Sequence, residues 1–136
     1  MIRILTDSAA DLTEQEQAQP GVAVVPMAIT FEDGTTIEDD GRMTKDEFFA
    51  RLAADAKLPR TSQPSPAAFI EAYADAEAAG DEVVVITVAQ KLSGTYQCAV
   101  LAAKEVDTPV YVVDSETAAQ GEAELLREAL RLRDQG

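Results

Sequence analysis

The sequence predicts an α/β fold in which a mostly parallel β-sheet is flanked by helices and carries a short antiparallel hairpin extension. Short β-branched runs alternate with longer stretches of helical periodicity, which is the pattern of βαβ units. One run, VVVITVA at 83–89, is apolar almost throughout, as is typical of a strand covered on both faces. The dipeptide Asp33-Gly34 follows an apolar run and is a hairpin signal.

The strands are predicted from apolar and β-branched runs. Residues 2–6 suit a buried strand at the start of the sequence. Residues 22–31, VAVVPMAITF, are rich in β-branched side chains, and Pro26 within them predicts an edge, a bulge or a bend. The remaining strands are predicted at 35–37, which would pair back across the hairpin, at 83–89 and at 110–113.

The helices are predicted from capping residues followed by apolar residues at helical spacing. Thr44 and Glu47 form a capping box, and Ser65-Pro66 is a serine cap with proline at the first helical position. Ser93-Gly94 opens a helix of small residues, and the last helix covers 121–133. The apolar residues at helical spacing are Phe48, Phe49, Leu52 and Ala56 in the first helix, Phe69, Ile70 and Tyr73 in the second, Ala99, Ala102, Ala103 and Val106 in the third, and Leu125, Leu126, Ala129 and Leu130, expected to point inward, in the last.

Length and composition predict one globular domain with a single core. The chain has 136 residues, of which 46% are apolar and 26% charged. Its formal net charge of −14 argues against binding to nucleic acid or to an anionic membrane, because acidic surfaces repel phosphates. The single cysteine excludes an internal disulfide, and no apolar run is long enough to cross a membrane. We therefore expect a soluble cytoplasmic protein.

Polar residues gather where predicted strands end, which is where ligands bind in open α/β sheets. Thr6-Asp7-Ser8, Asp114-Ser115 and residues 91–95 follow strands, and the predicted loop TSQPSP at 61–66 adds three hydroxyls and an amide. Within 91–95, a glycine lets the backbone approach a ligand, and the start of a helix favours an anion. The alternative is that Ser93 only caps its helix.

A catalytic interpretation would use Asp7, Ser93 and Asp114 in a small hydrolase or phosphatase. A serine nucleophile needs a base, usually histidine, and the sequence has none; Lys91 is a poor substitute. The two aspartates could bind Mg²⁺, but Thr-Asp-Ser lacks the second aspartate of such phosphatases, so we expect both to accept hydrogen bonds from loop amides. Glycine-rich nucleotide loops are absent. The residues therefore favour an anion-binding site, with no cofactor and no metal.

Seven motifs occur in an order that resembles the DegV family of bacterial fatty-acid-binding proteins. They are ILTDSAADL (4–12), VVPMAITF (24–31), Asp39-Asp40-Gly41, LPRTSQPSP (58–66), GDEVVVITV (80–88), LSGTYQCA (92–99) and VDSETAAQG (113–121). The resemblance spans essentially the whole chain, and TSQPSP and SGTYQ at this separation are specific together. One departure is that the family often has serines where Val88 and Ala89 stand.

The resemblance implies the N-terminal domain of a two-domain protein, with the C-terminal domain of the family absent from this sequence. It implies a long-chain fatty acid held between the domains, its carboxylate bound by Thr61, Ser62 and Ser93 and its acyl chain mainly in the second domain. Gly94 and Thr95 would shape the same pocket. Family members present the fatty acid to a fatty acid kinase resembling dihydroxyacetone kinases, so the resemblance implies a carrier rather than an enzyme. An uncovered acyl pocket would favour self-association. A further alternative is a folded fragment without independent activity.

Overall fold

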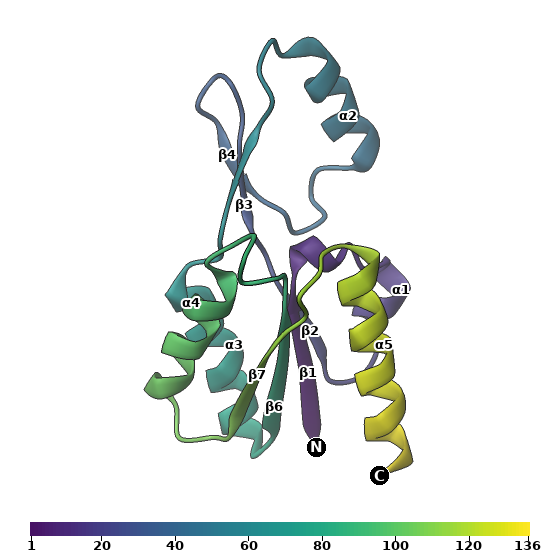
Figure 1. Ribbon diagram of the computed structural model, residues 1–136, viewed down its shortest axis with the longest axis vertical. Coiled ribbons are helices and arrows are strands. Elements are labelled where there is room, and N and C mark those ends of the chain that lie inside the picture. The colour runs from purple at the N-terminus through teal and green to yellow at the C-terminus, as the bar shows by residue number, and fades with distance from the viewer.

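The computed structural model describes residues 1–136 and contains two β-sheets with helices around them (Figure 1). The first sheet has four parallel strands in the order β2-β1-β6-β7, and the second has three antiparallel strands in the order β4-β3-β5. The strands are β1 (Ile2–Asp7), β2 (Val22–Val25), β3 (Ala28–Thr30), β4 (Thr36–Glu38), β5 (Arg60–Ser62), β6 (Glu82–Thr87) and β7 (Val110–Asp114). The helices are η1 (Ser8–Ala10), α1 (Glu14–Gln17), α2 (Lys45–Ala54), α3 (Pro66–Ala79), α4 (Thr95–Ala102), η2 (Ala103–Glu105) and α5 (Gln120–Gln135). The predicted α/β class with an antiparallel extension is confirmed.

The apolar run at 22–31 is divided between the two sheets, as the proline within it predicts. Val25 ends β2 and is paired with Asp7 of β1, whereas Ala28 begins β3, which pairs with β4 and β5. Because proline lacks the N–H that a continuous strand needs, the chain leaves the parallel sheet at Pro26. The antiparallel sheet therefore extends beyond the carboxyl ends of the parallel strands (Figure 1).

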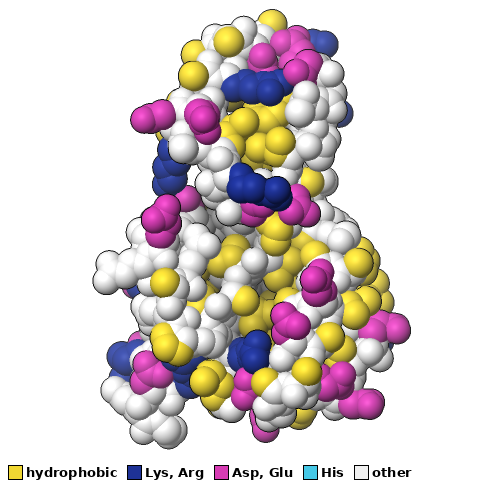
Figure 2. All heavy atoms as spheres, turned by 180° about the vertical axis from the view of Figure 1, so that it is seen from behind, with side chains coloured by type: hydrophobic (Ala, Val, Ile, Leu, Met, Phe, Trp, Pro, Cys, Tyr) yellow, Lys and Arg dark blue, Asp and Glu magenta, His cyan; other side chains and the backbone are white.

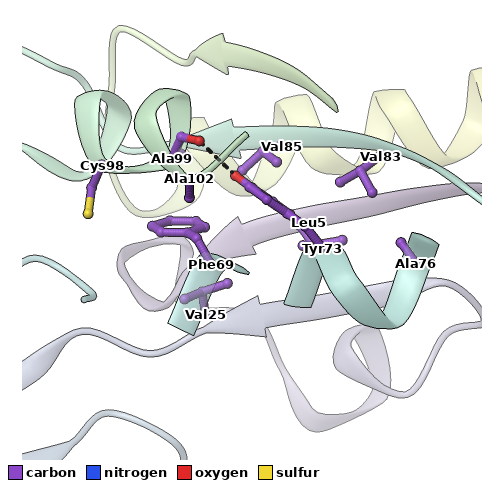
Figure 3. Packing of buried hydrophobic residues seen from close by; sticks show 10 residues of the cluster. All are labelled: Leu5, Val25, Phe69, Tyr73, Ala76, Val83, Val85, Cys98, Ala99 and Ala102. Carbon is purple, nitrogen blue, oxygen red and sulfur yellow. Dashed lines mark hydrogen bonds between the residues drawn. The ribbon is translucent and has the colours of Figure 1, made fainter. Parts of the chain in front are cut away.

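Helices α3 and α4 cover one face of the parallel sheet and bury the larger of two apolar clusters (Figure 3). Phe69 and Tyr73 of α3 are fully buried in this cluster together with Val83 and Val85 of β6. The Tyr73 hydroxyl donates a hydrogen bond to the carbonyl oxygen of Ala99 in α4 at 3.2 Å, so its buried polar atom is satisfied. Burial raises the pKa of Tyr73 above its ordinary range. The tyrosine thus holds together the two helices that follow the TSQPSP and SGT motifs.

Helix α5 covers the other face of the sheet. Its buried residues are Glu122, Ala123, Leu126 and Leu130. The expectation that Leu125 points inward is wrong, because 42% of this residue is exposed. Glu122, Leu126 and Leu130 share the inner face at a spacing of four residues. Since glutamate is normally assigned to solvent, the apolar pattern alone could not show that this face includes an acid.

Helix α2 begins after the predicted capping box and packs on the hairpin that precedes it. The guanidinium of Arg51 lies 4.1 Å from the centroid of the Phe31 ring and pairs with the carboxylate of Asp33. No residue of the helix is buried, Phe49 is 59% exposed, and Ala56 lies beyond the helix end. Figure 2 shows apolar side chains on this extension, with basic side chains beside them. None of the helices in the structure is long and apolar enough to span a membrane.

Candidate ligand-binding site

A pocket of about 560 Å³ lies where the carboxyl ends of the parallel strands meet the antiparallel sheet. Its lining residues come from segments far apart in the sequence, and they are Ala9, Met27, Ile29, Asp39, Thr61, Ser62, Gln63, Val88, Leu92, Ser93 and Gly94. The fold thus brings Thr61, Ser62, Ser93 and Gly94 to one pocket. This position is where ligands bind in open α/β sheets.

Thr61 and Ser62 lie in a strand rather than in the loop that the sequence predicts. Both belong to β5, where Thr61 is paired with Ile29 and Ser62 with Ala28 of β3. The strand is short, each of its residues is exposed, and none is apolar, so apolar periodicity could not reveal it. It forms because β3 offers a pairing partner. The strand pairing holds the two hydroxyl-bearing residues in place in addition to the neighbouring prolines.

Ser93 precedes α4, and Thr95 holds its hydroxyl. The two hydroxyl oxygens are 2.9 Å apart, and the N–H of Thr95 donates a hydrogen bond to Ser93 Oγ at 3.3 Å. Thr95 is fully buried and does not line the pocket, so it lies behind Ser93. Ser93 accepts from the first N–H of the helix and also lines the pocket. The alternative that Ser93 only caps its helix is not met, because the N-cap position of α4 is Gly94 and no side chain caps the helix.

Asp7 lies beneath the pocket and orders its floor. Its carboxylate accepts hydrogen bonds from the N–H of Ala9 at 3.0 Å and from the N–H of Val88 at 2.7 Å, and both of these residues line the pocket. Burial raises the pKa of Asp7, and the two N–H donors oppose that rise. The expectation that Asp7 binds loop amides is confirmed.

Asp114 accepts hydrogen bonds from loop amides as well, which confirms the second expectation. Its Oδ1 accepts from the N–H of Gln90 at 3.1 Å and from the N–H of Glu116 at 2.9 Å. The loop after β7 also contacts the pocket floor, because the N–H of Ala119 donates to the carbonyl oxygen of Ala9 at 3.0 Å. Asp114 does not line the pocket. The VDSETAAQG motif therefore supports the site from behind.

Glu122 is a buried acid that sequence reasoning missed, because acids are common in the first turn of a helix. Its Oε1 accepts a hydrogen bond from Thr6 Oγ1 at 2.9 Å, while Oε2 is buried without a donor to accept from. Burial and the neighbouring Asp7 carboxylate raise the pKa of Glu122 to about 9. A proton on Oε2 would satisfy that atom, since it could be donated to Asp7. Glu122 therefore carries its proton at neutral pH and lies beside Asp7 beneath the pocket.

The pocket lining contains no lysine or arginine, and Asp39 is its only charged residue. A bound anion would rely on hydroxyl groups and on the N–H groups at the start of α4, where the helix dipole adds partial positive charge. The apolar lining residues, which carry no motif signal of their own, are Ala9, Met27, Ile29, Val88 and Leu92. The lining therefore combines neutral donors with an apolar surface.

The structure does not join Asp7, Ser93 and Asp114 into catalytic machinery. The Ser93 hydroxyl contacts Thr95 and is not hydrogen-bonded to either aspartate, and both aspartates accept from backbone N–H groups. The structure contains no group of three or more His, Cys, Asp or Glu side chains that could hold a metal ion. The chemistry that the pocket residues offer is hydrogen bonding and apolar contact.

Comparison with known sequences relates the chain to one family. Residues 1–136 match the DegV family, whose members are described as uncharacterised proteins. A DegV domain-containing protein from Deinococcus radiodurans is 41% identical over 120 residues, which is 88% of this chain and 42% of that protein. A fatty acid-binding protein from Thermotoga maritima is 41% identical over 117 residues, which is 84% of this chain and 40% of that protein. The chain spans less than half the length of these two relatives.

Comparison with solved structures shows the same fold. A fatty-acid-binding DegV family protein from Thermus thermophilus has a TM-score of 0.89 and 36% identity, over 99% of this chain and 48% of that one. A stearic acid-binding protein from Eubacterium ventriosum has a TM-score of 0.92 and 30% identity, over 100% of this chain and 48% of that one. A protein from Thermotoga maritima, described as having a fatty acid binding function, has a TM-score of 0.92 and 36% identity, over 99% of this chain and 50% of that one.

Proposed function

The chain belongs to the DegV family, and on that premise we propose that its pocket binds the carboxylate of a long-chain fatty acid. The observation that carries the proposal is the meeting of Thr61, Ser62 and Ser93, which come from two distant segments, in one pocket at the ends of parallel strands. Fatty acids are also what the similar proteins from Thermus thermophilus and Thermotoga maritima are described as binding.

The proposed headgroup contacts are hydrogen bonds from neutral donors. The hydroxyls of Thr61, Ser62 and Ser93 would donate to the carboxylate oxygens, and the N–H groups at the start of α4 would add electrostatic support. Pairing with β3 fixes the backbone of Thr61 and Ser62, and Thr95 holds the hydroxyl of Ser93. Donors that are already positioned lose little freedom when a ligand binds, which favours affinity.

We propose that the acyl chain lies mainly in the part of the relatives that this chain does not span, as the two-domain arrangement of the family implies. Each buried methylene contributes about 0.8 kcal/mol, so the cover over the acyl chain, more than the headgroup, sets the affinity. The apolar lining residues of the pocket would then contact only the carbons next to the carboxylate. The headgroup specificity would reside in this chain and most of the affinity elsewhere.

The proposed role is that of a cytoplasmic carrier that presents the fatty acid to a fatty acid kinase resembling dihydroxyacetone kinases. The exposure of Thr61 and Ser62 supports a headgroup that a partner can reach. With ATP, fatty acid and such a kinase, an acyl phosphate should form only when carrier and kinase are both present. Formation by the carrier alone would contradict the assignment as a non-enzyme. Ester hydrolysis by the chain, lost in Ser93→Ala, would favour a hydrolase instead.

The binding proposal is tested by removing single hydroxyls and titrating the 136-residue chain with decanoate by NMR. Thr61→Ala and Ser93→Ala should each weaken binding, because a hydrogen bond to a charged group contributes about 1.5–3 kcal/mol, which is at least a tenfold change. Thr35→Ala is the matched control, since Thr35 is an exposed hydroxyl outside the pocket. Unchanged affinity in both pocket variants would rule out this headgroup site.

A further inference from the structure

Gln63 lies in the pocket between the hydroxyls of β5 and the start of α4, and its carboxamide rests against Gly94. A Cβ added to Gly94 would lie 2.0 Å from Gln63 Oε1 and 2.9 Å from its Cδ, so the carboxamide occupies the space of a side chain at 94. The φ of −74° and ψ of 4° at Gly94 are open to any residue. The backbone conformation therefore does not require glycine here, whereas the position of Gln63 does.

Contacts on both sides hold the backbone of Gln63. Ser62 before it is paired in β5. Pro64 after it is buried, and its carbonyl oxygen accepts a hydrogen bond from Cys98 Sγ of α4 at 3.3 Å. These contacts fix where the side chain leaves the backbone, and Gly94, which has no side chain, leaves the space in which the carboxamide of this exposed residue lies. The carboxamide is thereby positioned at the pocket although it makes no hydrogen bond to another protein group.

We propose that Gln63 is a further headgroup ligand whose Nε2 donates a hydrogen bond to the bound carboxylate, with Gly94 as the residue that positions it. This inference rests on the proposed function. The added Cβ would lie 2.0 Å from Oε1 and 3.3 Å from Nε2, so the carboxamide lies beside Gly94, and no protein hydrogen bond holds its NH₂ away from a bound anion. An amide is an uncharged donor, so it suits a pocket that holds no basic side chain.

An NMR titration of the labelled 136-residue chain distinguishes a ligand-binding role from simple space filling. The side-chain NH₂ signals of Gln63 should shift with decanoate but not with 1-decanol, which has the same chain length and no carboxylate. Gln63→Ala should weaken decanoate binding about tenfold, and Gln63→Glu should weaken it more, because two carboxylates repel each other. Gln97 is exposed on α4 outside the pocket, so Gln97→Ala should leave binding unchanged.

A double-mutant cycle tests the role of Gly94. Gly94→Ala should displace Gln63 and weaken binding about as much as Gln63→Ala, while the double variant should be no weaker than either single one. The inference would be overturned if the losses of decanoate affinity in the two single variants added up in the double variant. It would also be overturned if the wild type bound decanoate and Gln63→Ala bound it equally well. If circular dichroism shows that Gly94→Ala does not fold, Gln63→Ala and Gln63→Glu still test whether Gln63 binds the carboxylate. A wild-type chain that binds no decanoate would overturn the proposed function and this inference together.

Discussion

Glu122→Gln should raise the free energy of unfolding above the wild-type value, and this difference should grow as the pH rises. The carboxyl of Glu122 is fully buried, receives a hydrogen bond from Thr6, and has one oxygen without a donor. In the folded protein the pKa of this carboxyl is raised to about 9 from an ordinary value of 4.5, first by burial and then by the neighbouring Asp7. Glutamine keeps the shape of the side chain and an N–H group that can donate to Asp7, but it cannot ionise.

The sign of the pH effect comes from the number of protons bound in each state. Between pH 4.5 and about 9 the unfolded chain has lost the proton of Glu122, whereas the folded protein still holds it. The stabilising contribution of the raised pKa is therefore present in full below pH 4.5 and is lost as the pH rises through about 9. The loss is on the order of 1 kcal/mol per pH unit for one proton. Glu122→Gln removes this dependence.

Urea denaturation followed by circular dichroism, repeated from pH 5 to pH 9, would measure the difference between the variant and the wild type. Titrating groups other than Asp7, which interacts directly with Glu122, are common to both proteins, so the difference isolates the Glu122–Asp7 pair. Glu124→Gln is the matched control, because Glu124 is on the same helix with 71% of its side chain exposed, and its difference from the wild type should be small. A difference for Glu122→Gln that stays flat with pH would refute the buried, protonated glutamate.

Three further predictions concern the core and the ligand. Leu126→Ala should destabilise the protein by about 2–5 kcal/mol in urea denaturation, because Leu126 is buried. Leu125→Ala should change stability by less than about 1 kcal/mol, because Leu125 is exposed. Equal effects of the two substitutions would contradict the orientation of α5. Tyr73→Phe should lower the free energy of unfolding by about 1 kcal/mol in the same assay, because it removes the hydrogen bond to Ala99; an unchanged value would show that this bond contributes nothing. Labelled oleate should be lost from the 136-residue chain during gel filtration or kept only on self-associated species, and stoichiometric retention on a monomer would place the acyl pocket within these residues.

The parts of the fold that the sequence predicts are those with a local cause. The capping box at Thr44, the serine cap before Pro66 and the break at Pro26 act through neighbouring residues, and each is found where its pattern indicates. Strand β5 has no such cause, because Thr61 is in a strand only through its pairing with Ile29. Leu126 and Leu130 lie on the inner face of α5 as predicted, but Glu122 could not be predicted there, since a buried acid depends on groups distant in the sequence.

In the candidate site, too, some features could be predicted from sequence motifs and others depend on contacts between distant residues. Motif order selects Thr61, Ser62 and Ser93, and the fold places them around one pocket, although their binding of a carboxylate stays a prediction. The contact between Gln63 and Gly94 joins two loops, and neither the glutamine nor the glycine indicates this contact in the sequence. The hydrogen bonds that Asp7 accepts below the pocket follow from its place at a strand end, where unpaired loop N–H groups are available.

A crystal structure of the chain with bound decanoate tests the central claim most directly. We expect the carboxylate at the start of α4, within hydrogen-bonding distance of the hydroxyl of Ser93 and of a hydroxyl from Thr61 or Ser62, at about 2.5–3.0 Å. The acyl chain should leave the pocket toward solvent. A carboxylate bound elsewhere, for instance beside Asp114 or on the extension that carries α2, would contradict the proposed headgroup site.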